Sequence, residues 1–361
     1  MICQLTENLL PGDAISDHVR ALDGAMRELG YDAALCVGQG GGTVRVRDLP
    51  GALGEEDLLL YEYSIGSPLN EWFAAQRCKK AIVYQNITPP EVLEPYAARL
   101  ADAARWGRQQ LREILPTLSF ALASSEYSAG ELRGMGCGDV SVLPILLDGR
   151  RYEEAPEENL LRKLSDGKKN ILFVGRKAPN KRIEDVLLAA DYYAAATHTP
   201  CRVVLAGDES MTRYCRALRE LAAKLSVELL WLGRVPMAQL IAAYRGSHLF
   251  LCMSEHEGFC VPLLESMLFD LPVLAFDAAA VPETLGGSGV VFRRKSLPEL
   301  ARVMDALLFD EALRQEVVAS QRRRLENFKA DKIRDTLGRI LKDHGFFPEG
   351  EKGAVRGWKE R

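Results

Sequence analysis

Hydrophobic and polar residues alternate along the chain in a pattern that predicts short buried strands separated by amphipathic helices. In the first part of the chain, apolar runs of four to eight residues start near positions 2, 33, 57, 80, 120 and 139. Between the first two runs, apolar side chains recur at helical spacing from Ile15 to Leu29, after Asp13 as an N-cap. Strand followed by helix, repeated, predicts a parallel sheet.

The same pattern restarts after a charged stretch at residues 148–169, which we interpret as a linker with about one turn of helix. Further strands are predicted near positions 170, 201, 227, 248, 272 and 289. Helices are predicted to begin near Lys181, Met211, Pro236, Pro262 and Leu297. We therefore expect domains at 1–150 and 165–325, a terminal helix at 326–345 that can pack back on the first domain, and a frayed tail at 346–361.

Length and composition support this division. A chain of 361 residues, 47% hydrophobic and 27% charged, is too long for one ordinary core, so two domains with a cleft are expected. The net charge is −4 and the basic residues are scattered, which argues against a nucleic-acid partner. Eight cysteines without Cys-x-x-Cys spacing are typical of buried reduced thiols in a cytoplasmic protein.

Membrane association is left open by the sequence. There is no signal-like N-terminus and no run of 18 apolar residues, so neither export nor a membrane span is expected. The helical stretch 99–118 has basic and apolar positions that suit either a peripheral contact with the inner face of the membrane or, with about twice the weight, packing on the core.

Candidate chemistry lies where the predicted strands end, because ligands of open α/β sheets bind at the carboxyl edge. In the second domain, Gly175 and Gly233 begin two of these junctions, and Arg176 and Lys181 place two cations after one strand. Two cations beside a helix N-terminus suit a diphosphate, and a solvated basic turn has equal weight. Neither a P-loop nor a dinucleotide fingerprint is present.

The stretch SEHEGFCVPLLES, residues 254–266, sets two carboxylates around a glycine and a proline directly after an apolar strand. Pro262 suits the first turn of a helix that carries Glu265, and Glu257 lies in the preceding loop. Glu265 can accept two ribose hydroxyls and Glu257 the hydroxyls of a neighbouring sugar, while Gly258 lets the backbone come close. A capping acid with a solvated helix face is the weaker interpretation, because the segment is largely apolar.

These residues give the second domain a resemblance to the retaining glycosyltransferases of family 4, the glycosyl transferases group 1. The resemblance rests on Glu257-Gly-Phe-x-x-Pro-x-x-Glu265, on Gly175-Arg176 with Lys181, and on the segment 272–292. It covers most of residues 165–310 and is looser over the first domain, where YQNITPPE is similar to the YHNITP segment of some bacterial members. It implies the GT-B fold, with two facing Rossmann-like domains, parallel sheets and a deep interdomain cleft.

The resemblance also implies residue roles. Arg176 and Lys181 would bind the donor pyrophosphate, and Glu257 would act with them at the reacting sugar. The full donor set would be Gly175, Arg176, Lys181, Gly233, Arg234, Val235, Glu257, Gly258, Phe259, Cys260, Val261, Pro262 and Glu265. The acceptor or transferred-sugar side would be Gly12, Asp13, His18, Gln85 and Asn86.

Two first-domain positions depart from a simple assignment. Gln85 stands where relatives commonly have a histidine, and glutamine does not titrate near neutral pH, so a first-domain histidine as proton carrier is placed in doubt. His18 is the other candidate, although a satisfied or exposed helix histidine has about twice the weight.

The function implied is retaining transfer of a hexose from a UDP- or GDP-linked sugar to a saccharide or lipid-linked saccharide, in bacterial surface glycan synthesis, with no cofactor and no obligatory metal. The absence of Asp-x-Asp supports a metal-independent site. Three rivals remain: a sugar-nucleotide epimerase or hydrolase, a glycan phosphorylase with pyridoxal phosphate, and a non-catalytic sugar-nucleotide-binding protein. Donor base, hexose, acceptor and oligomeric state are not determined by the sequence.

Overall fold

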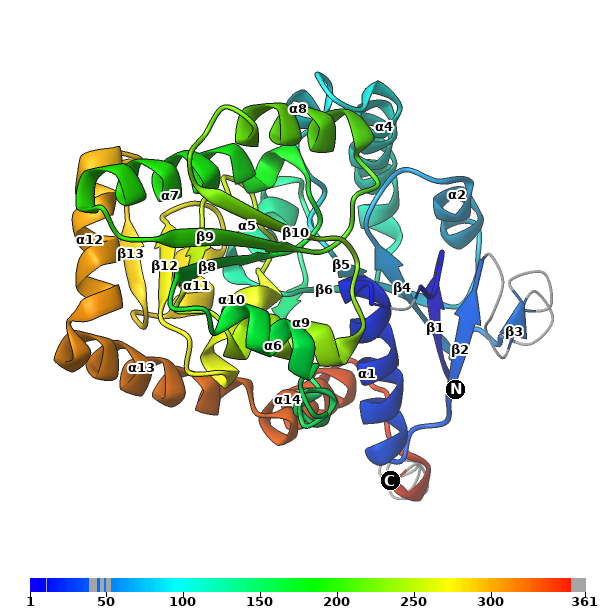
Figure 1. Ribbon diagram of the computed structural model, residues 1–361. Coiled ribbons are helices and arrows are strands. Elements are labelled where there is room, and N and C mark those ends of the chain that lie inside the picture. The colour runs from blue at the N-terminus through cyan, green and yellow to red at the C-terminus, as the bar shows by residue number, and fades with distance from the viewer. Residues whose placement is uncertain (11, 39–43, 46–48, 50–52, 352–361) are drawn as a thin grey trace. The chain divides into compact units, whose positions relative to one another are not determined.

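The computed structural model describes residues 1–10, 12–38, 44, 45, 49 and 53–351 (Figure 1). The chain divides into two compact units. The first unit comprises residues 1–87, 102–148 and 328–361, and the second comprises residues 88–101 and 149–327. Of the tail expected at 346–361, residues 352–361 lie outside the described residues.

A parallel sheet of seven strands forms the centre of the first unit, in the order β3-β2-β1-β4-β5-β6-β7. The central strands consist almost entirely of buried residues, as expected for a sheet covered on both faces. The strands are β1 (Ile2–Thr6), β2 (Ala33–Val37), β3 (Val44–Arg45), β4 (Leu58–Tyr63), β5 (Lys79–Tyr84), β6 (Phe120–Ala123) and β7 (Val140–Val142).

Helices of the first unit include one from each end of the chain. α1 (Ala14–Glu28) begins after Asp13, whose carboxylate accepts a hydrogen bond from the Ser16 N–H at 2.9 Å, as the sequence predicts for an N-cap. α14 (Ala330–Asp343) contributes Ile333 and Leu337 to the same hydrophobic core as Ile2 and Leu22. The other helices are α2 (Pro68–Ala74), α4 (Ala98–Ile114), which starts in the second unit, and α5 (Glu126–Gly134).

α4 packs closely on the first unit through two glycines. A Cβ added to Gly107 would lie 2.4 Å from the Gly66 nitrogen, so both positions require glycine. Gln110 on the same helix is buried and donates to the Ser67 carbonyl at 3.0 Å. This helix, which the sequence left between core packing and membrane contact, therefore has a packed face.

The second unit has a parallel sheet of six strands in the order β10-β9-β8-β11-β12-β13. When the strands are numbered within this unit, the order is 3-2-1-4-5-6, as in Rossmann domains. Such domains bind nucleotides beside their first and fourth strands. The strands are β8 (Lys169–Val174), β9 (Cys201–Ala206), β10 (Glu228–Leu232), β11 (Leu249–Cys252), β12 (Val273–Phe276) and β13 (Val290–Phe292).

The five predicted helix starts of the second unit are met within two residues by α7, α8, α9, α10 and α12, and four further helices had no predicted start. The helices of this unit are α3 (Pro90–Leu93), α6 (Glu158–Leu164), α7 (Ile183–Thr197), α8 (Thr212–Ala222), α9 (Met237–Arg245), α10 (Val261–Leu268), α11 (Val281–Leu285), α12 (Leu297–Phe309) and α13 (Glu311–Leu325). α6 lies in the segment predicted to be a linker and is longer than expected, because Leu160 and Leu164 are buried on one face. The segment 149–169 therefore belongs to the second unit rather than connecting the two.

All eight cysteines are buried and free, as their spacing predicts. None of the described helices combines the length and the hydrophobicity that a membrane span requires.

Candidate active site

The sheet order of the second unit places the ends of β8 and β11 next to each other. The chain leaves β8 toward Arg176 and Lys181, and it leaves β11 toward Glu257. Because β9 lies on the other side of β8, consecutive connections diverge here, and a crevice forms at such a switch point in doubly wound sheets. The sequence-predicted cations and acids therefore flank the position where this topology binds ligands.

Backbone hydrogen bonds connect the strand ends at Gly175 and Gly233 with Gly207, the residue that follows β9. The Gly175 N–H donates to the Ala206 carbonyl at 2.9 Å, and the Gly207 N–H donates to the Gly233 carbonyl at 3.0 Å. A Cβ at Gly207 would lie 2.1 Å from the Gly175 oxygen, and the φ of Gly207 is +128°. Position 207 therefore requires glycine, because the ends of β8 and β9 approach closely there. The hydrogen bond to Gly233 connects this place with the segment 233–235.

Lys181 and Glu257 form a buried ion pair, with 2.5 Å between Nζ and Oε2. Their side chains are 18% and 7% exposed, so solvent screens this pair little. Burial opposes the charge on Lys181, but the Glu257 carboxylate outweighs it, and the pKa of Lys181 lies above its ordinary value. The pair brings together one predicted phosphate ligand and one predicted hexose ligand.

Arg176 is exposed at the same edge of the sheet, and its charge affects the pKa of Lys181 and the pKa of Asp208. It opposes the charge on Lys181. Burial tends to raise the pKa of Asp208, but hydrogen bonds from Ser210 and the charges of Arg234 and Arg176 hold that pKa below its ordinary value. The exposed Arg176 and the largely buried Lys181 therefore place two cationic groups at this edge of the sheet.

The loop after β11 is held by side chains from two other segments. The Asn180 amide donates to the His256 carbonyl at 3.0 Å, and the Thr284 hydroxyl donates to the Phe259 carbonyl at 2.5 Å. Two residues that start helices here, Arg182 and Cys260, have φ of +49° and +72°. Left-handed backbone at residues other than glycine is costly and concentrates at functional sites.

Glu265 lies on α10, and two tyrosines donate hydrogen bonds to it. The Tyr152 hydroxyl donates to Oε1 at 2.5 Å and the Tyr244 hydroxyl to Oε2 at 2.6 Å. These two hydroxyl donors orient the carboxyl group of Glu265 within α10. The other predicted donor residues of this region lie in the loop or in the first turn of α10: Gly258, Phe259, Cys260, Val261 and Pro262.

The comparisons with known proteins agree with this geometry. Residues 157–324 match the family described as Glycosyl transferases group 1. Over these residues the chain is similar to the group 1 glycosyltransferases. A serotype-specific mannosyltransferase, WbdA of Escherichia coli, is 30% identical over 152 residues, which are 41% of this chain and 18% of that protein. A GDP-mannose-dependent alpha-mannosyltransferase of Mycolicibacterium smegmatis is 33% identical over 128 residues, 34% of this chain and 30% of that protein.

The matched segments span less than a third of each of these two relatives. Among solved structures, HepE of Anabaena in complex with UDP and glucose has a TM-score of 0.73 at 16% identity and covers 95% of this chain and 99% of that one. This likeness extends over both units and shows that the fold is GT-B, as the resemblance predicted.

In the first unit, the predicted residues lie near the carboxyl end of the sheet but do not all come together. Gly12 is exposed with φ of +65°, and Asp13 caps α1. His18 is buried, and neither of its ring nitrogens has a hydrogen-bond partner. Burial lowers the pKa of His18 to about 4, so the ring is neutral at pH 7. The sequence favoured a His18 side chain that is either hydrogen-bonded or exposed, and this prediction is wrong.

Gln85 belongs to a buried polar group on the first sheet. Its amide donates to Glu62 at 2.8 Å, and the Gln4 amide donates to the other Glu62 oxygen at 3.0 Å. Burial raises the pKa of Glu62 to about 7 against the effect of these two donors. Asn86, with φ of +59°, turns away to donate to the Ser128 hydroxyl at 3.0 Å.

Sequence reasoning missed four residues of these groups. Glu62, Tyr152 and Tyr244 lie far along the chain from their partners and carry no motif. Lys177, which follows Arg176, is fully buried, and its ammonium donates to the Gly207 carbonyl at 2.8 Å. Burial lowers the pKa of Lys177 to about 8. A lysine directly after a buried strand was the one available signal.

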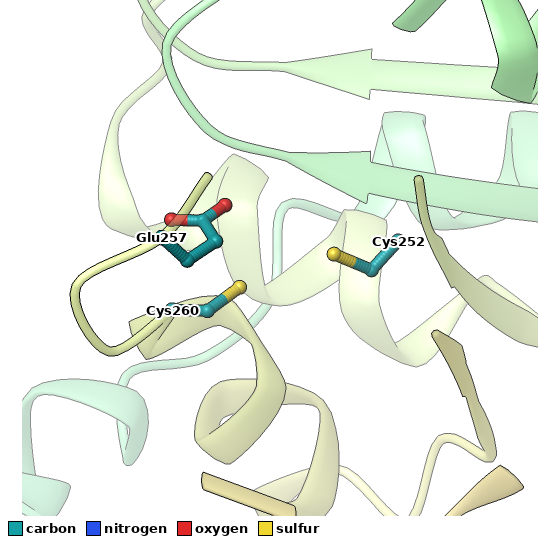
Figure 2. A group of neighbouring side chains, drawn as sticks. All are labelled: Cys252, Glu257 and Cys260. Carbon is teal, nitrogen blue, oxygen red and sulfur yellow. The ribbon is translucent and has the colours of Figure 1, made fainter. Parts of the chain in front are cut away.

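Among the described residues, Cys252, Glu257 and Cys260 could hold a metal ion, because their ligand atoms all lie within 4.8 Å of one another (Figure 2). Cys252 ends β11, Glu257 lies in the loop, and Cys260 precedes α10. Figure 2 shows the two sulfur atoms turned toward each other, with the Glu257 side chain beside them.

Proposed function

We propose that the protein is a retaining glycosyltransferase that moves a hexose from a GDP- or UDP-linked donor to a saccharide or lipid-linked saccharide acceptor. The observation that carries this proposal is the buried Lys181–Glu257 pair beside the exposed Arg176 at the switch point of the second sheet. Cationic side chains bind a diphosphate, and a carboxylate accepts hydrogen bonds from sugar hydroxyls. The two kinds of group are adjacent here, in Lys181 and Glu257.

In this proposal, Arg176 and Lys181 bind the pyrophosphate and stabilise the charge that grows on it as the glycosidic bond breaks. Glu257, with the backbone at Gly258 and Phe259, accepts hydrogen bonds from the hexose hydroxyls. Glu265 accepts those of the ribose while the two tyrosines orient its carboxylate. The segment 233–235 contacts the base.

The transfer proposed for this site needs neither a protein nucleophile nor a bound metal. The acceptor hydroxyl arrives on the face that the diphosphate leaves, and a diphosphate oxygen takes its proton. Gln85 in the first unit then serves as a hydrogen-bonding group rather than as an acid, since glutamine does not titrate. The relatives named for mannosyl transfer and for GDP-mannose support a GDP-mannose donor, and the UDP complex of HepE supports a UDP-sugar.

A thermal-shift screen tests the binding part of the proposal. GDP, UDP and NAD are compared at equal concentration, and we expect stabilisation by GDP or UDP and none by NAD. A ligand at about 100 times its dissociation constant contributes about 2.7 kcal/mol. A response to NAD alone would reject a nucleotide-sugar site.

Product analysis tests the reaction. With GDP-mannose or UDP-glucose and a mixture of oligosaccharide and lipid-linked acceptors, we expect an elongated glycan whose new bond keeps the anomeric configuration of the donor. Donor alone should give little free sugar and no epimer. Release of free hexose or formation of an epimer at the same rate without acceptor would favour the hydrolase or epimerase, and loss of activity in EDTA would contradict metal independence.

A further inference from the structure

The two thiols beside the proposed hexose ligand have no role in the transfer just described. Cys252 and Cys260 are 1% and 8% exposed and come from the end of β11 and the start of α10. The Cys252 thiol contacts the Ser254 hydroxyl at 3.4 Å. Among the described residues, the other six cysteines belong to no comparable group of ligand atoms.

We propose that Cys252, Cys260 and Glu257 form a binding site for a thiophilic divalent cation of the zinc class, and that its occupancy inhibits the enzyme. Two sulfur ligands and one carboxylate form a donor set that suits Zn²⁺, whereas Mg²⁺ and Ca²⁺ prefer oxygen alone. Tetrahedral bonds of about 2.0–2.3 Å separate ligand atoms by roughly 3.3–3.8 Å. The separations here, all within 4.8 Å, need only a small adjustment to reach that range.

The charge balance favours the exchange. Without metal, the Lys181 ammonium and the Glu257 carboxylate offset each other's charge. A dication that displaces the two thiol protons leaves the total charge of the group unchanged, even with Lys181 still beside it. Binding therefore releases two protons and does not require a new counter-charge in this buried place.

Occupancy has a consequence for the proposed function, on which this step rests. Glu257 cannot ligate the ion and also keep its full set of hydrogen bonds to Lys181 and to a hexose. The ion therefore competes with the nucleotide sugar, and the inhibition should appear as a higher apparent KM for the donor. A water molecule can take the fourth position, as in open zinc sites.

Direct metal binding is the primary test and needs no activity. The reduced full-length protein is titrated with Co²⁺, whose thiolate charge-transfer band reports sulfur ligation, and then with Zn²⁺ in competition with a chromogenic chelator. We expect one ion per chain with the thiolate band, and an affinity at least about 100-fold lower in Cys252→Ser, Cys260→Ser and Glu257→Gln taken separately. Cys201→Ala, a buried cysteine of the same unit outside the group, should bind as the wild type does.

Because each of the three proposed ligands is replaced in a separate variant, the test still gives an answer if one variant fails to fold. The site is rejected if the thiolate band is absent, if the variants bind as tightly as Cys201→Ala, or if thiol titration shows a Cys252–Cys260 disulfide that forms in place of metal binding. In the activity arm, Zn²⁺ should raise the donor KM of the wild type but not of Cys252→Ser. Metal binding without any transfer activity would reject the proposed function and leave the cation site standing.

Discussion

The two units have the same strand order around their first and fourth strands but place different chemistry there. In the second unit, the loops after β8 and β11 carry the Lys181–Glu257 pair and the exposed Arg176. In the first, β1 carries Gln4 and β4 carries Glu62, which accepts hydrogen bonds from the amides of Gln4 and Gln85. The same strand order therefore supports charged side chains in the loops of the second unit and a buried group of amides and one carboxyl within the sheet of the first.

The largest expected effect is on the ion pair of the second unit. Lys181→Met leaves the Glu257 carboxylate buried and uncompensated, which typically costs about 3–5 kcal/mol. Denaturant unfolding measures the loss, and adding Glu257→Gln to the variant should recover much of it. Lys168→Met, which breaks the exposed pair with Glu228, is the control and should change stability far less. Equal losses in the two lysine variants would mean that burial does not distinguish the site.

Removal of the exposed cation should affect turnover rather than folding. Arg176→Ala should lower kcat by about 10² to 10³-fold, the usual loss of one preorganised donor to a transition state. Steady-state kinetics with the donor that passes the screen measures it, alongside Arg216→Ala, an exposed arginine on α8. Near-normal turnover of the Arg176 variant would remove this residue from the proposed mechanism.

The carboxyl of the first unit should make stability depend on pH. Because the pKa of Glu62 is raised to about 7 in the folded protein, its neutral form is favoured there. The associated stability is complete below about pH 4 and is lost as pH rises through about 7, a change of about 3 kcal/mol. Raising the pH from 5 to 8 should therefore lower the unfolding free energy of the wild type relative to that of Glu62→Gln. The His18 contribution is common to both proteins and cancels.

A smaller effect is expected at the second carboxylate of the motif. Tyr244→Phe removes one donor from the buried Glu265 and should lower the free energy of unfolding by about 1.5–3 kcal/mol, the range for hydrogen bonds to charged groups. Chemical denaturation is again the measurement. Tyr192→Phe, at an exposed tyrosine of α7, should be close to neutral, and an equal effect in both variants would contradict the role of Tyr244.

Local patterns predicted most of the elements but not the division of the chain. The strands and the helix starts of the second unit follow from apolar runs and turn residues, because these are local properties. Residues 88–101 nevertheless cluster with the second unit, where the ring of Tyr96 packs 5.0 Å from that of Tyr214. Periodicity does not encode such a contact between distant positions.

The candidate site was predictable in part for the same reason. Arg176, Lys181, Glu257 and Glu265 follow strand ends in a recognisable spacing, so their neighbourhood could be predicted from topology. Their immediate partners could not, since Tyr152 reaches Glu265 across 113 positions of sequence. The pKa of Glu62 depends on burial between strands, which no single residue type indicates.

The return of the chain to the first unit has a consequence for biosynthesis. Ile333, Leu337 and Leu341 of α14 complete a core that includes Ile2 and Leu58. On the ribosome, the N-terminal sheet must therefore wait for α14, while all residues of the second unit have been synthesised by residue 327. The portion synthesised later matures first, and a premature stop just after residue 327 would leave it intact beside an N-terminal sheet with an open apolar face.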